Sequence, residues 1–96
     1  MKILALEIGS PVTDPGQFQP HLKSEAARIW QLNQSNLLRE IYFRTDRSTV
    51  ILVFECVDIA EAQAAVDSLP LVQQGLIRFE LIPLKPYPGF SRLFAE

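Results

Sequence analysis

The chain has 96 residues, a mass of 10.9 kDa and a formal net charge of −2 at pH 7, so it has room for one domain, residues 1–96, and for a single hydrophobic core. Apolar residues make up 48% of the sequence and charged residues 21%, a composition typical of a folded protein and not of a disordered one. The acidic balance and the scattered basic residues argue against nucleic acid as a partner, and Cys56, the only cysteine, excludes an intramolecular disulfide.

The first third of the chain predicts a strand and a helix. Residues 2–8 (KILALEI) form a short apolar run that ends at Gly9, which favours a buried strand. Two helix starts are possible, one with Asp14 as N-cap and Pro15 in the first position, the other at Pro20. We expect the helix over residues 20–35, with Asn36 as a left-handed stop and helical spacing at Leu22, Ala26, Ile29, Trp30 and Asn33.

The remaining elements follow in the order strand, strand, helix, strand. Residues 37–44 and 49–56 are rich in β-branched and aromatic side chains and flank a polar turn, which predicts a hairpin. Residues 58–69 predict a helix that ends before Pro70, with Asp58 and Glu61 at the spacing of a capping box. Residues 76–84 predict a last strand, so residues 1–84 form the core and residues 85–96 an apolar tail that should dock on the core or on a partner subunit.

This βαββαβ order indicates an α+β, ferredoxin-like fold, in which two helices cover one face of a four-stranded antiparallel sheet. We expect the helices to cover one set of hairpin residues, namely Leu37, Arg39, Ile41, Phe43, Val50, Leu52, Phe54 and Cys56. The other face is predicted to carry Leu38, Glu40, Tyr42, Arg44, Thr49, Ile51, Val53 and Glu55, together with Ile3, Ala5, Glu7, Arg78, Glu80 and Ile82. That second face holds too many aliphatic side chains to lie bare in water, which predicts a second copy packed against it.

These features resemble the muconolactone isomerase family of the dimeric α+β barrel superfamily. The resemblance rests on the element order, on Asp14-Pro15, on the helix ending Ser68-Leu69-Pro70-Leu71, on the strand from Ile77 to Leu81 and on Pro86-Tyr87-Pro88. It implies that the sheets of two subunits close into a barrel with the helices outside, in a homodimer or a larger ring. It also implies an isomerase of small anionic lactones, which removes a proton beside a carbonyl and returns it elsewhere without metal or cofactor.

The resemblance points to Glu25, on the inward side of the first helix, as the catalytic base. His21, the only histidine, lies one turn before it and is a candidate proton shuttle by its residue type. The alternative for Glu25 is an exposed carboxylate paired with His21 or Arg28, and the alternative for His21 is a surface histidine.

Three further residues are candidates for binding a small anionic or cyclic metabolite. Arg39, expected among apolar residues under the helices, would hold a ligand carboxylate, unless it pairs with Glu55 or Glu25 or turns outward. Tyr42 and Trp30 would line the pocket, unless they are core or interface residues.

No metal or cofactor is expected, since a glycine-rich phosphate loop and ligand-spaced His, Asp and Glu clusters are lacking. No apolar run approaches 18 residues, so we expect neither a membrane span nor export, and a cytoplasmic protein. Whether the protein is an enzyme stays open. The alternatives are a non-catalytic binding or accessory dimer with an occluded or merely ligand-holding pocket and, ranked last, a cofactor-free or haem-dependent oxidation with His21 as axial ligand.

Overall fold

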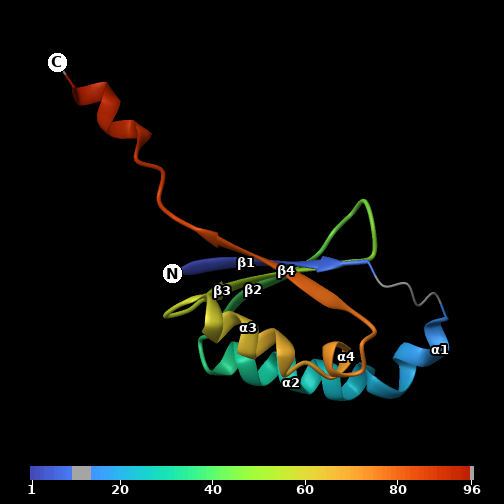
Figure 1. Cartoon of the computed structure of the whole chain (residues 1–96). Helices are drawn as coiled ribbons and strands as arrows, with labels where there is room; N and C mark the ends of the chain where they lie inside the picture. The colour runs from blue at the N-terminus through green and yellow to red at the C-terminus, as the bar shows by residue number, and fades with distance from the viewer. Residues whose placement is uncertain (10–13, 96) are drawn as a thin grey trace.

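The computed structural model describes residues 1–9 and 14–95 and shows a sheet with helices on one face (Figure 1). The sheet has four antiparallel strands in the order β2-β3-β1-β4. The strands are β1 (Lys2–Ile8), β2 (Leu38–Phe43), β3 (Val50–Glu55) and β4 (Arg78–Leu84). This is the ferredoxin-like arrangement that the sequence predicts.

The helical segments are α1 (Pro15–Phe18), the 3-10 turn η1 (Gln19–His21), α2 (Leu22–Gln34), α3 (Ile59–Asp67), α4 (Pro70–Gln73) and the 3-10 segment η2 (Gly89–Phe94). Helices α2 to α4 lie on one side of the sheet, α1 and η1 lead from β1 into α2, and η2 follows β4 (Figure 1). Both predicted helix starts are used: Asp14 caps α1 by accepting from the Gly16 backbone N–H at 2.9 Å, and Pro20 lies in η1.

Local sequence signals account for the ends of the two main helices. Asn36 has φ 64° just after α2, the left-handed conformation expected there. At the start of α3 the Asp58 carboxylate accepts from the Glu61 N–H at 2.9 Å, and the Glu61 carboxylate accepts from the Val57 N–H at 3.1 Å. The short helix α4 was not predicted, although Pro70 at its first position is well suited to begin a helical turn.

The core lies between the sheet and helices α2 and α3. Its fully buried side chains come from every layer and include Ile3, Ala5, Leu38, Leu52, Phe54, Ala62 and Leu69. About 0.8 kcal/mol per buried methylene makes this layer the main source of stability.

A β-bulge changes which side chains of β2 face the helices. The register pairs Leu38 with Phe54 and Ile41 with Leu52, and it shifts between Leu38 and Glu40. The extra residue brings both Leu38 and Ile41 onto the helix side, and it leaves Arg39 exposed instead of buried under the helices. The prediction that Arg39 lies on the helix-facing side and Leu38 on the other was therefore wrong, because strict alternation fails at a bulge.

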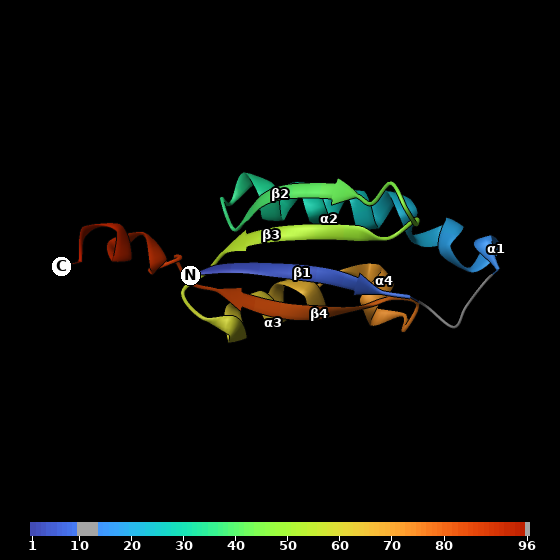
Figure 2. The same ribbon diagram turned by 90° about the horizontal axis from the view of Figure 1, so that it is seen from above.

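The side chains of β1 that were predicted to lie on the open face point to the opposite side of the sheet. Ile3 pairs with Phe54 and Ala5 with Leu52, so these side chains and Glu7 point toward the helices, not to the open face. The open face instead carries half-buried aliphatic side chains of three strands, namely Leu4, Leu6, Ile51, Val53 and Ile82. Figure 2 looks onto this face, and no other described element covers it.

Residues 85–95 leave the sheet at the end of β4 and lead to η2, which lies away from the rest of the molecule (Figure 1). The described chain is consequently long and thin, with extents of 61, 29 and 19 Å. Within the segment, the Tyr87 and Phe90 rings meet edge to face with centroids 5.0 Å apart. Phe90, Leu93 and Phe94 are 68%, 77% and 84% exposed.

Candidate functional site

A cleft of about 910 Å³ lies between helices α1 and α2 and the sheet. The sheet side is formed by strands β1, β2 and β3, and α4 contributes at one end. The lining is mainly apolar and consists of Glu7, Pro15, Phe18, Gln19, Leu22, Glu25, Ala26, Ile29, Trp30, Asn33, Ile41, Phe43, Ser48, Val50, Leu71 and Ile77. A concave, mostly apolar site with a few polar groups is the usual form of a small-molecule site.

One stripe of α2 forms the helical wall of the cleft. Its members recur every three or four residues, and they are Leu22, Glu25, Ala26, Ile29, Trp30 and Asn33. Most of the periodic apolar side chains that predict this helix therefore line the cleft. The residues of α2 that are buried are Glu25 and Leu32. Trp30 is 64% exposed, so the cleft opens to solvent beside its indole ring.

Glu25 is the buried charged residue of the described chain, with 7% of its surface exposed. Its Oε1 atom accepts a hydrogen bond of 2.9 Å from the Leu71 backbone N–H, which lies in the first turn of α4. Burial raises the pKa of the Glu25 carboxyl, and the Leu71 hydrogen bond offsets part of that rise. The alternative of an exposed Glu25 paired with His21 or Arg28 is wrong, because the carboxyl faces the cleft and α4.

Glu7 is a second carboxyl in the same cleft, and the sequence analysis did not assign it to the site. Its Oε1 atom accepts from the Val50 backbone N–H at 3.2 Å. Burial raises the pKa of Glu7, the Val50 hydrogen bond lowers it, and the nearby charge of Glu25 raises it. One sequence signal was available: Glu7 follows Ile3 and Ala5 at the alternate positions of β1, where a core side chain is expected.

Trp30 lies at the wall of the cleft, whereas His21 is not among the residues that line it. His21 ends η1 and is half-buried, and its backbone carbonyl accepts from the Ser24 hydroxyl at 3.0 Å. The structure therefore places Glu25 and Trp30 at one cleft and His21 outside its lining.

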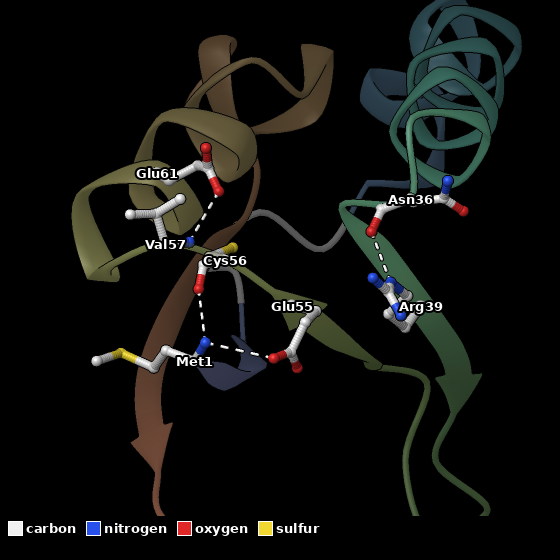
Figure 3. A network of polar contacts seen from close by, with 7 residues as sticks. All are labelled: Met1, Asn36, Arg39, Glu55, Cys56, Val57 and Glu61. Carbon is white, nitrogen blue, oxygen red and sulfur yellow. Dashed lines mark hydrogen bonds and ion pairs between the residues drawn. The ribbon is translucent and has the colours of Figure 1, made fainter.

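Arg39 and Tyr42 lie away from the cleft. Figure 3 shows the Arg39 guanidinium beside the Asn36 carbonyl, to which its Nε donates at 2.6 Å. Glu55, an alternative partner for Arg39, instead contacts the Met1 amino group at 3.3 Å. Tyr42 is exposed on the open face, where its hydroxyl donates to Glu40 at 2.8 Å, and this hydrogen bond raises the pKa of Tyr42.

The chemistry available in the cleft is proton transfer. Two carboxyls with raised pKa values share an apolar space, and in each carboxyl one oxygen accepts a backbone hydrogen bond. A carboxyl whose pKa moves toward neutrality is both a better base and a usable acid near pH 7. Within residues 1–9 and 14–95, no group of three or more His, Cys, Asp or Glu side chains is arranged to hold a metal ion. No helix in these ranges is long and apolar enough to cross a membrane.

Comparison with solved structures gives the fold. No family model matches the sequence, and no curated protein sequence is significantly similar to it. Muconolactone isomerase superposes with a TM-score of 0.75 at 18% identity, over 93% of each chain. A 5-chloro-2-hydroxyhydroquinone dehydrochlorinase from Burkholderia phenoliruptrix, in complex with 2,5-dihydroxybenzoquinone, superposes with a TM-score of 0.63 at 17% identity, over 91% of this chain and 96% of that one. The chain has the protomer fold of muconolactone isomerase, as the sequence resemblance implied.

Proposed function

We propose that the chain is a cofactor-independent enzyme that moves a proton beside the carbonyl group of a small cyclic compound. The observation that carries this proposal is the pair of carboxyls, Glu7 and Glu25, at the wall of one apolar cleft. The two solved structures of similar fold support it, since one is an isomerase and the other a dehydrochlorinase by name.

Glu25 is the better base and Glu7 the better acid. The charge of Glu25 raises the pKa of Glu7, which favours Glu7 as the carboxyl that holds the proton in this proposal. The Glu25 carboxylate then removes a proton from the carbon next to the carbonyl, and the released electron pair forms an enolate. Glu7 returns its proton to another carbon of the conjugated system, and a proton passes from Glu25 to Glu7 to restore the starting state.

The apolar lining contributes by excluding water, which strengthens the interaction of polar groups with the developing enolate. Gln19 and the Trp30 indole are uncharged donors at the wall of the cleft. Arg39 lies outside the cleft, so this proposal assigns it no contact with the ligand.

We propose further that the chain works as a homodimer or as a larger homo-oligomer. The open sheet face carries Leu4, Leu6, Ile51, Val53 and Ile82, and a second copy packed against it would remove this aliphatic surface from water. Such a dimer would leave the cleft accessible, because the cleft lies on the helix side of the sheet.

Solvent exchange tests the proposed chemistry. A β,γ-unsaturated γ-lactone without charged substituents, incubated with the protein in D₂O, should incorporate deuterium and shift its double bond, as followed by NMR. Glu25→Gln should slow both processes by about 10²-fold or more, the usual effect of losing a general base. Asp67→Asn, an exposed isosteric change on α3, is the control and should leave the rate unchanged.

An exchange rate no faster than that of buffer would contradict the proposal. If the lactone nevertheless stabilises the protein against heat, the chain is a binding module on the same fold, the alternative left open by the sequence.

A further inference from the structure

The charges of the cleft have one sign. Among the sixteen lining residues, Glu7 and Glu25 are acidic, and Gln19, Asn33 and Ser48 are polar but uncharged. No Lys, Arg or His is among these lining residues of the described chain. Residues 10–13, which lie outside the described ranges, are Ser, Pro, Val and Thr and add no cation by sequence.

The basic side chains nearest in sequence are engaged elsewhere or turned outward. Arg28 lies on another side of α2, where its Nε donates to the Ser68 hydroxyl at 2.8 Å and its guanidinium to Gln31 at 3.1 Å. Arg44 is paired with Asp46 in the hairpin turn. Lys23, Arg47 and Arg78 are exposed and do not line the cleft. His21, next to Leu22 in the sequence, is not among the lining residues either.

A ligand carboxylate would therefore lose its hydration in the cleft without gaining an ionic partner. Burying an unpaired charge is costly, and the negative charge of the ionised Glu25 carboxylate adds repulsion. An uncharged ring would instead meet aliphatic and aromatic side chains, among them Phe18, Ile29, Trp30 and Phe43.

From these charges we infer that the ligand of this cleft is an uncharged, mostly apolar cyclic carbonyl compound, and that the cleft discriminates against ligands bearing a carboxylate. This inference rests on the proposed function for the position of the ligand beside Glu7 and Glu25. It departs from the anionic lactone that the sequence resemblance implied, because Arg39, the expected partner of a ligand carboxylate, is held beside Asn36 outside the cleft.

A matched pair of ligands tests the inference. The probes are an unsaturated γ-lactone that carries a carboxymethyl group and the methyl ester of the same compound, titrated into the full chain at pH 7 by isothermal calorimetry. The ester should bind about tenfold more tightly than the acid or better, since one unfavourable charge interaction of ordinary size has this effect. Equal or tighter binding of the acid would overturn the inference, as would a failure of both compounds to bind.

Charge-removing variants identify the source of the discrimination. The double variant Glu7→Gln/Glu25→Gln keeps the side-chain shapes, removes the negative charge of the pair and should bring the affinities for acid and ester closer together. Asp67→Asn, on the exposed end of α3, should leave the ratio of the two affinities unchanged. A ratio of acid to ester affinity that the double variant leaves unchanged would contradict the electrostatic origin of the discrimination.

The outcome is separable from that of the proposed function. If the ester binds more tightly than the acid but neither exchanges protons with solvent, the inferred uncharged ligand is confirmed and the proposed proton transfer is wrong. If the acid binds more tightly than the ester and is isomerised, the proposed proton transfer is confirmed and the inferred preference for an uncharged ligand is wrong.

Discussion

Glu25 and Glu7 each lose contact with water on folding, and each accepts one backbone hydrogen bond. The Leu71 and Val50 N–H groups hold one oxygen of each carboxyl at 2.9 and 3.2 Å. Burial remains the largest influence on both carboxyls, so their pKa values stay above the ordinary range of a glutamate. Burial therefore destabilises the ionised form of each carboxyl, whereas a side chain that only accepts a backbone hydrogen bond would not need to be ionisable.

This destabilisation of the ionised form predicts the pH dependence of stability. Because the folded state raises the pKa of Glu25, this residue favours folding most below its unfolded pKa, about 4.3, and the benefit is lost as pH rises through the folded pKa. In the Glu25→Gln variant the new side chain cannot ionise but can still accept from the Leu71 N–H. The free energy of unfolding of this variant relative to the unsubstituted protein should therefore increase as pH rises above about 4, as measured by urea unfolding at a series of pH values.

Asp67→Asn is the control for removing one negative charge from an exposed site. A difference between Glu25→Gln and the unsubstituted protein that stays constant, or that falls with rising pH, would contradict the raised pKa.

At the scale of elements, the ends of α3 and α2 depend on short-range contacts. Asp58 accepts from the Glu61 N–H, Glu61 accepts from the Val57 N–H, and Asn36 takes the left-handed conformation with φ 64°. These contacts span four residues or fewer, and this is why composition and spacing alone identify them.

Removal of the α3 cap should be measurable. Asp58→Ala leaves the Glu61 N–H without its acceptor and should lower the free energy of unfolding by about 1 kcal/mol in urea titrations. Asp14→Ala, at the four-residue helix α1, is the comparison and should cost less, because α1 contributes no buried residue. Equal losses in both variants would mean that α3 does not depend on its cap more than α1 does.

At the scale of the whole molecule, two apolar surfaces are exposed in the single chain. One is the open sheet face, and the other is the C-terminal segment, residues 85–95, which lies beyond the end of β4 (Figure 1). Tyr87 packs against Phe90 and lies against the buried Gly89, whereas Phe90, Leu93 and Phe94 keep most of their surface in water. The homo-oligomer proposed above would cover both surfaces.

Removal of this segment tests its contribution to assembly. The chain truncated after Leu84 keeps every strand and helices α1 to α4, so its far-UV circular dichroism should retain an α+β shape. Burial of even one Phe side chain is worth about 1.5–3 kcal/mol, so the dissociation constant of the oligomer should rise by about tenfold or more in sedimentation measurements. The full chain is the control, and equal dissociation constants for the two would show that the segment does not join subunits.

The sequence alone determined the element order, the fold class, the helix caps and the apolar stripe of α2, because these depend on neighbours one or two turns apart. Only the tertiary structure decided which side chains share the cleft. The bulge after Leu38 removed Arg39 from the helix side, and packing of α2 against the sheet brought Glu7 of β1 into one cleft with Glu25, eighteen positions along the chain. Strand facing changes completely with a shift of one residue, so a pattern of alternation predicts a sheet far better than it predicts a site.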